Sequence, residues 1–447
     1  MSSTPKPLLS VPDGICLTVG MVVGVGIFKA PGQIAGASSS AAEFFFAWAL
    51  GGIACLCGAL VYAELASRQP GAGGEYTFLR RGWGSCVAFV FAWSRMTVVQ
   101  TGAIAAVSFV FGEYASQVVP LGANSTAWWA ATGVLLLTGL NLAGALQSTS
   151  LQKFLVLALV ASLAAVAVGG IVVGGPAKPA SGATSGSFSL AMIFVLYTFG
   201  GWSEAAYLGG EVRDASRNMA KILVYGILLV TALYLLVNLG YSSALGLGGM
   251  KESKVIAFDA MRLLAGEKAA VVLALLVCVA ALTTMNAAIF TGARTIWAMG
   301  VDSPGMRFLG QWRDEGSTPA NALSIQSAIV LALIWAGSFT EDGFEAMVAY
   351  GLPVFWLFLL LIGLTPFVLR QRGDVADFKV PLFPLVPIAF CSMCLFMLWS
   401  SIQYLRDPVF GPKFGALVLA GIVVVAAGVP LYFVVRRREI RVSAGAA

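Results

Sequence analysis

The stretch VPDGICLTVGMVVGVGIFKAPGQI, residues 11–34, decides the fold of this chain. It is apolar and long enough to cross a bilayer, but Gly24-Val25-Gly26 interrupts it. A second apolar stretch, residues 188–210, is interrupted by YTFGGW at 197–202. Backbone groups released from a helix inside a membrane are tolerated only where they line a cavity or are buried in protein. Two such breaks at corresponding places in two halves of a chain point to a ligand site near the middle of the bilayer.

The composition is that of an integral membrane protein. The chain is 59% hydrophobic and 11% charged, with a mean hydropathy of +0.88, whereas soluble domains carry about 25% charged residues. Apolar runs of spanning length recur along the whole chain. We therefore predict an all-α protein with twelve transmembrane helices, near 11–35, 41–66, 84–112, 127–144, 153–174, 187–210, 221–246, 269–299, 320–339, 344–369, 381–404 and 414–435.

The basic residues predict the orientation in the membrane. Most of the 27 Lys and Arg residues fall in loops and tails on the same side as the N-terminus. The positive-inside rule then places both termini, residues 1–10 and 436–447, in the cytoplasm. The net charge of +6 reflects this topology, so we expect no nucleic-acid partner.

Histidine is absent, and the seven cysteines lie in or beside apolar segments. A catalytic triad and haem ligation through histidine are excluded, and CSMC at 391–394 is better explained as helix packing than as half a zinc site. We therefore expect no enzyme activity, no metal and no cofactor.

The first ten predicted helices form two sets of five, each led by a broken helix. This ten-helix core would occupy 11–372, with one repeat at about 11–174 and the other at about 187–369. An odd number of helices per repeat inverts the second repeat relative to the first. The two helices within 373–435 form an addition, and the polar segment 302–319 is expected to contain a short surface helix.

Four segments together resemble the amino acid–polyamine–organocation superfamily, and bacterial amino acid permeases within it. They are GVGIF at 24–28 with PG at 31–32, YAEL at 62–65 with PGAGGEY at 70–76, GW at 201–202 through EVRDASRN at 211–218, and TP at 318–319. The resemblance covers roughly 11–435. It implies a LeuT-type fold, with discontinuous first and sixth helices, and amino acids or related amines as substrates.

The breaks suggest how an amino acid would bind. N–H groups of the half-helix that starts after Gly26 would receive a carboxylate, and the carbonyls of Val22 and Val23 would receive an ammonium group. The resemblance adds carbonyls from Tyr197 and Gly200. Val25 stands where the family often has serine, so a hydroxyl contact is lost. The predicted binding set is Val22, Val23, Gly24, Val25, Gly26, Ile27, Tyr197, Thr198, Phe199, Gly200, Trp202 and Asn286. The alternative is that these glycines only permit close helix packing.

Selectivity for the substrate side chain would come from Tyr197, Phe199, Trp202, Asn286 and the segment 98–103. The two aromatic residues Tyr197 and Trp202 could equally serve in ordinary packing.

Ionisable residues inside a membrane are costly and point to function. Arg95 and Glu204 are predicted to pair, with Glu204 a candidate proton carrier; the alternative is a static ion pair. Thr283 and Thr284 could bind sodium or simply bond their own helix backbone. Leu159 occupies the position where some family members carry a lysine in place of sodium. Glu64 is expected to face the membrane interface. Coupling stays open between proton, which we favour, sodium, and exchange without an ion.

We therefore expect a secondary active transporter that moves L-amino acids by alternating access, as a symporter or an exchanger. The alternatives are a channel or a non-transporting sensor on the same scaffold, or a polyamine substrate. The protein would be a monomer or homodimer in the plasma membrane, in a bacterium the inner membrane.

Overall fold

The computed structural model describes residues 10–68, 74–144, 149–174, 187–204, 212–313, 318–403 and 411–445. The predicted N-terminal tail up to residue 9, the loop motif at 70–73 and the motif residues 205–211 lie outside this described part. Within it, every regular element is a helix, and the β-bridge between Arg313 and Thr318 stands alone.

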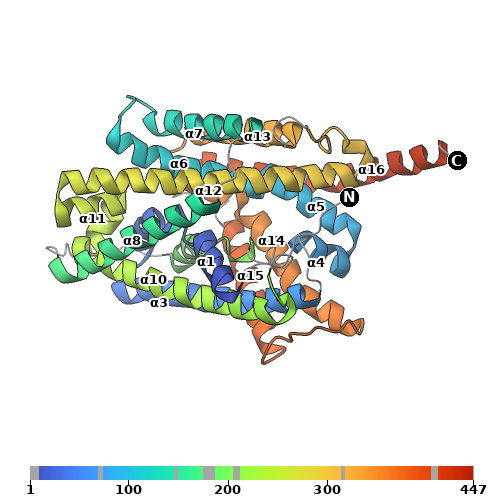
Figure 1. Ribbon diagram of the computed structural model, residues 1–447, viewed down its shortest axis with the longest axis horizontal. Coiled ribbons are helices and arrows are strands. Elements are labelled where there is room, and N and C mark those ends of the chain that lie inside the picture. Colours follow the sequence, from blue (N-terminus) through green and yellow to red (C-terminus); the bar gives the residue numbers. More distant parts are fainter. Residues whose placement is uncertain are drawn as a thin grey trace. The chain divides into compact units, whose positions relative to one another are not determined.

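The helices follow one another along the chain as Figure 1 shows. The elements are α1 (Val11–Val22), η1 (Val25–Phe28), α2 (Ala30–Ala37), α3 (Ala41–Arg68), α4 (Gly74–Trp83), α5 (Ser85–Ser94), η2 (Arg95–Val99), α6 (Gln100–Val118), α7 (Ser125–Leu142), α8 (Thr149–Val173), α9 (Phe188–Thr198), α10 (Ala215–Glu252), α11 (Ile256–Ala265), α12 (Glu267–Asp302), η4 (Pro304–Met306), α13 (Ala320–Gly337), α14 (Gly343–Gln371), α15 (Leu385–Gln403) and α16 (Gly411–Gly445). Within 302–319, where a short surface helix is expected, the described residues contain the short 3₁₀ helix η4, in which Met306 is buried.

Eight helices in the described residues are long and apolar enough to cross a membrane. They include α3, α10, α12 and α16, and two shorter apolar helices are Val11–Val22 and Val160–Val173. Two of the twelve expected segments fall short because of the breaks, which end α1 after 12 residues and α9 after 11 residues. Many exposed side chains are large and apolar, among them Trp128 and Val172, as a lipid-facing surface requires.

Local sequence explains where the first helix begins. Ser10 caps α1, accepting the Asp13 N–H, and the Asp13 carboxylate accepts the Ser10 N–H in return at 3.2 Å. Pro12 lies in the first turn, where its missing N–H has no helical partner to lose. This reciprocal cap fixes the N-terminal end of the segment that carries the first break.

The chain divides into two compact units. Unit 1 consists of Met1–Gly82, Val156–Val277 and Leu359–Ser400; unit 2 consists of Trp83–Leu155, Cys278–Phe358 and Ser401–Ala447. Both broken segments belong to unit 1. Its helices approach closely where small residues meet: a Cβ on Gly240 of α10 would lie 2.5 Å from the Cα of Ala167 in α8.

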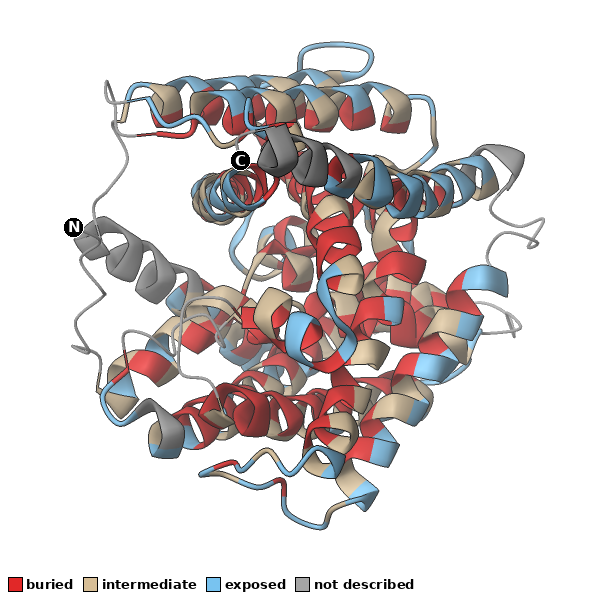
Figure 2. Cartoon of the chain, turned by 90° about the vertical axis from the view of Figure 1, so that its right-hand side faces the viewer, coloured by how far each residue is buried: buried red, intermediate tan, exposed pale blue. Residues whose placement is uncertain are grey.

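The two helices at the C-terminal end belong to different units. In unit 1, Phe390 of α15 packs against Trp202. In unit 2, Trp93 donates a hydrogen bond to the Val424 carbonyl of α16 at 2.7 Å. α16 continues as helix to Gly445, through the residues expected to form a tail. Figure 2 shows helices that carry both buried and exposed residues, and others that are buried or half-buried over most of their length.

Candidate functional site

The first break lies where the glycines predict it. α1 ends at Val22, and the last turn is closed by the Val23 N–H, which donates to the Val19 carbonyl at 2.7 Å. Gly24 is extended, with φ −94° and ψ −163°, and the chain then restarts as the 3₁₀ helix η1. The break is therefore two residues long, Val23 with φ −74° and ψ 72° and the extended Gly24, between two helical segments.

The second break follows α9. The Phe199 N–H donates to Val195 at 3.0 Å and the Gly200 N–H to Tyr197 at 2.8 Å, which ends the helix. Gly201 then adopts φ +99°, a conformation that glycine reaches without a steric penalty. A 3₁₀ turn at 202–204 follows, closed by the Glu204 N–H on the Gly201 carbonyl at 3.1 Å.

The two breaks lie against each other within unit 1. A Cβ on Gly26 would lie 3.3 Å from both the Cα and the Cγ2 of Thr198. A Cβ on Gly201 would overlap the carbonyl oxygen of Met21. The packing role considered for these glycines is thus real at both positions, and it is what brings the two interrupted backbones together.

Tyr234 of α10 joins the two breaks. Its hydroxyl lies 2.8 Å from the Val22 carbonyl and 3.1 Å from the Thr198 carbonyl, and the side chain is fully buried. The ring packs against Phe199 at 5.1 Å and against Trp48 at 5.5 Å. The sequence reasoning missed this residue, since only the need of a buried tyrosine hydroxyl for a partner could have singled it out.

These contacts remove one predicted ligand-binding group, the Val22 carbonyl, from the first break. The Val22 carbonyl accepts both the Gly24 N–H at 2.7 Å and the Tyr234 hydroxyl. A carbonyl oxygen has two lone pairs, so both are engaged within the protein. In this conformation Val22 therefore holds the break in shape.

The aromatic residues predicted to select the substrate are packed within unit 1. Phe199 is fully buried between Trp48 and Tyr234. Trp202 is 5% exposed and meets Tyr62 at 4.8 Å edge-on. Tyr197 is half-buried. In this conformation the rings of Phe199 and Trp202 pack against other aromatic side chains and support the second break.

Three other predicted residues, Asn286, Thr283 and Thr284, lie on α12 in unit 2. The Asn286 side-chain oxygen accepts a hydrogen bond from the Asn141 amide at 2.6 Å. The Thr283 hydroxyl donates to the Val279 carbonyl at 2.9 Å, which is the bond to its own helix backbone considered as the alternative to sodium binding. Thr284 is half-buried. Asn286 thus connects α12 with α7.

Arg95 begins the π-helical turn η2, which overlaps the start of the predicted selectivity segment 98–103. It is 5% exposed and donates to the Gln100 side chain at 2.9 Å, and the Gln100 amide in turn donates to the Ala288 carbonyl at 3.1 Å. π-turns are frequent at functional sites. Because Glu204 belongs to unit 1 and Arg95 to unit 2, their pairing stays a prediction.

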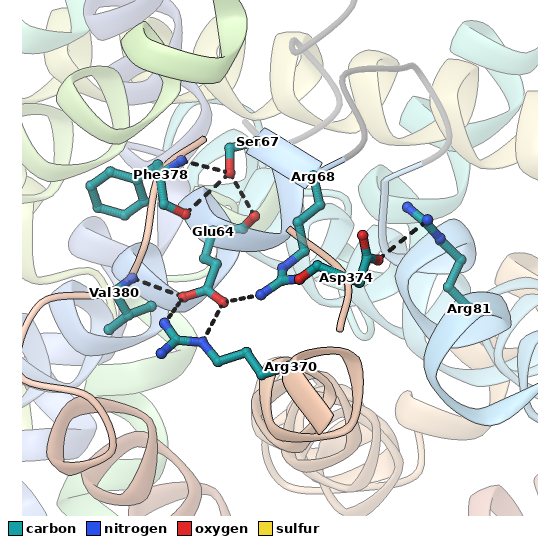
Figure 3. Close-up of polar contacts among 8 residues, drawn as sticks. All are labelled: Glu64, Ser67, Arg68, Arg81, Arg370, Asp374, Phe378 and Val380. Carbon is teal, nitrogen blue, oxygen red and sulfur yellow. Dashed lines mark hydrogen bonds and ion pairs between the residues drawn. The ribbon is translucent and has the colours of Figure 1, made fainter. Parts of the chain in front are cut away.

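The prediction for Glu64 is wrong. Expected at the membrane interface, its side chain is fully buried and forms ion pairs with Arg68 and Arg370 (Figure 3). The helix-end position suggested water, but the connection after α14 covers this end of α3. Among the described residues no cluster of three or more cysteine, aspartate or glutamate side chains is placed to hold a metal ion.

Comparisons with known proteins agree with the motifs. The profile of the amino acid permease family matches residues 9–427. The chain is 27% identical over 408 residues to the b(0,+)-type amino acid transporter 1 of Mus musculus, with 87% of this chain and 81% of that protein covered. It is 25% identical over 438 residues to the serine/threonine exchanger SteT of Bacillus subtilis (strain 168), with 95% and 96% covered.

A third relative, the cystine/glutamate transporter of Homo sapiens, is 24% identical over 434 residues, with 94% of this chain and 83% of that protein covered. These relatives are transporters and not enzymes, and the superfamily resemblance drawn from the motifs is confirmed. Since the family profile spans most of its length, the chain belongs to the amino acid permease family and is a multi-pass membrane protein.

Proposed function

We propose that this protein is a secondary transporter that moves L-amino acids across the plasma membrane by alternating access. The observation that carries the proposal is the meeting of two interrupted helices in unit 1, with Gly26 against Thr198 and one tyrosine hydroxyl on both backbones. The names of the relatives, each an amino acid transporter or exchanger, support the same substrate class.

The backbone of the breaks offers both halves of a zwitterion a partner. The first N–H groups of a helix have no intrahelical acceptor, so Val25, Gly26 and Ile27 at the start of η1 are suited to a carboxylate. Carbonyls of Val23, Tyr197 and Gly200 are suited to the ammonium group. The Tyr197 carbonyl already accepts the Gly200 N–H at 2.8 Å, which orients it at the end of α9.

Exchange is the mode that the relatives favour, because one of them is named a serine/threonine exchanger. In an exchanger, the site that has released one amino acid inside the vesicle or cell faces outward again only after it has bound another amino acid for the way out. Ion-coupled symport, with Glu204 and Arg95 as the proton pair or Thr283 and Thr284 as sodium ligands, is the other outcome that the experiment below separates.

The proposed topology has twelve spans, with an inverted repeat of five helices at about 11–174 and 187–369. The helices α15 and α16 follow the repeat, and both termini face the cytoplasm. The excess of Lys and Arg on that side supports this orientation.

Counterflow in proteoliposomes tests the proposal. Vesicles loaded with a mixture of unlabelled L-amino acids should accumulate an external radiolabelled amino acid transiently above its equilibrium level, and vesicles without protein should not. A channel would equilibrate without an overshoot, and a sensor would bind without flux. A thermal-shift screen of the twenty amino acids and common polyamines selects the label. An exchanger takes up the label without a pH or sodium gradient, but only into vesicles that contain substrate. A symporter takes up the label into empty vesicles when such a gradient is imposed.

A further inference from the structure

A buried ion cluster lies at the end of α3, centred on Glu64 (Figure 3). The Glu64 carboxylate is fully buried and accepts hydrogen bonds from the Arg370 guanidinium at 2.9 Å, from Arg68 at 2.6 Å and from the Val380 backbone N–H at 2.8 Å. A second nitrogen of Arg370 contacts its other oxygen, so that pair is bidentate. Charge and hydrogen-bonding capacity of the carboxylate are both satisfied, as a buried ion requires.

The cluster ties the connection between α14 and α15 to α3. Besides Val380, the Phe378 N–H donates to the Ser67 hydroxyl at 3.2 Å. Arg68 reaches the backbone carbonyl of Asp374, and the guanidinium of Arg370 lies 3.6 Å from the centre of the Phe383 ring. Residues 374–383, which have no regular structure of their own, are thus held at several points, and they lead directly into α15 at Leu385.

α15 in turn carries a ring that supports the second break. Phe390 lies 6.2 Å from Trp202, centre to centre, and both rings fill the space that Gly58 of α3 leaves. A Cβ on Gly58 would lie 2.6 Å from Phe390 and from Trp202. Trp202 directly follows Gly200-Gly201, so its placement constrains the backbone of the break.

We propose that Glu64 is a positioning residue for the candidate amino acid site, acting through the 374–383 connection and Phe390 on Trp202. The inference rests on the proposed function, since the break that Trp202 follows is one wall of that site. Glu64 touches no substrate in this account. Its carboxylate fixes where α15 begins, and therefore where the ring of Phe390 meets Trp202.

The test compares Glu64→Gln, Arg370→Lys and Phe390→Ala with a matched control, Asp374→Asn. Asp374 belongs to the same connection, but its carboxylate is 24% exposed and pairs at 3.3 Å with Arg81, which is 42% exposed. Its contact with Arg68 uses the backbone carbonyl, which the substitution keeps. A surface ion pair contributes little, so the control should behave as the parent protein does.

Two measurements decide the matter. The fluorescence of Trp202, taken as the difference between each protein and the same protein carrying Trp202→Phe, should shift to longer wavelength and become more accessible to iodide in the three test variants but not in the control. The KM for the amino acid found by counterflow should rise about tenfold in Glu64→Gln and Phe390→Ala, with the maximal rate per folded molecule changed by less than about twofold. Since both changes interrupt one chain of contacts, the double variant should raise KM by less than the product of the single effects.

A purely structural role for Glu64 would lower the amount of folded protein and leave KM of the remainder unchanged, and that result overturns the inference. Effects that multiply in the double variant overturn it as well. Should Glu64→Gln fail to fold, Arg370→Lys keeps the charge while losing the bidentate geometry and is read in its place. The fluorescence comparison needs no substrate: an unchanged Trp202 signal refutes the inference even where transport is intact, whereas absence of counterflow in the parent protein refutes the proposed function alone.

Discussion

A phenol hydroxyl buried among apolar helices must find an acceptor, and Tyr234 finds two, one from each interrupted helix. The sequence alone does not single out Tyr234, because the chain has eleven tyrosines and nothing local marks this one. The glycines were different: Gly24, Gly200 and Gly201 interrupt apolar runs, and the helices end beside them. For single residues, the sequence could therefore predict where the backbone leaves the helix, but it could not predict which distant residues a side chain contacts.

Replacing Tyr234 by Phe should lower the free energy of unfolding by about 1–2 kcal/mol, because two buried carbonyls lose a donor. It should also raise KM in counterflow, since both breaks lose their common support. Tyr241→Phe is the matched control: this hydroxyl lies on the same helix, is fully buried and has no hydrogen-bond partner among the described residues. Its removal should leave the melting temperature unchanged or higher. Equal melting temperatures and equal KM values for the two variants would show that the hydroxyl of Tyr234 supports nothing.

The helices that carry the candidate site are short because each of them ends at a glycine break. α1 and α9 stop at their breaks, and close contact between the breaks leaves room for no side chain at Gly201. Hydrophobic length alone predicted continuous spanning segments there, and only the glycine pattern corrected it. The burial of Glu64 escaped prediction since its partner Arg370 is 306 positions away in the chain.

Gly201→Ala should destabilise the protein by about 2–4 kcal/mol, because alanine disfavours the left-handed conformation and its Cβ would overlap the Met21 carbonyl. Gly36→Ala in α2 serves as control, since a Cβ there meets only the Lys251 side chain at an ordinary 3.6 Å. Thermal melting in detergent measures both. A Gly201→Ala protein as stable as the control would mean that the break does not require glycine.

At the scale of the whole molecule, both breaks and the Glu64 cluster belong to unit 1, while Asn286, Arg95 and the π-turn belong to unit 2. The predicted repeats run along the chain, but each unit takes segments from both. Composition and helix count could predict an all-helical membrane protein, and the sequence motifs could predict its family. They could not predict this division, because it depends on which helix faces pack together.

Replacing Glu204 by Gln should flatten the pH dependence of transport if this residue carries a coupled proton, since the amide neither binds nor releases one. Initial rates of uptake into proteoliposomes at a series of external pH values provide the measurement. Thr291→Ala is the control, because that hydroxyl donates to its own helix backbone and should leave the pH profile as it is. A pH optimum retained in Glu204→Gln excludes Glu204 as the proton carrier.

The hydroxyl of Tyr234 has one proton and two acceptors at unequal distances, 2.8 Å and 3.1 Å. The sharing of that proton changes whenever α9 shifts by a few tenths of an ångström relative to α1, and the electronic absorption of a phenol ring responds to the strength of the bond its hydroxyl donates. The difference spectrum between the parent protein and Tyr234→Phe therefore contains an optical signal of the separation between the two interrupted helices. The protein therefore carries, without any added label, a chromophore that reports how far apart its two breaks lie.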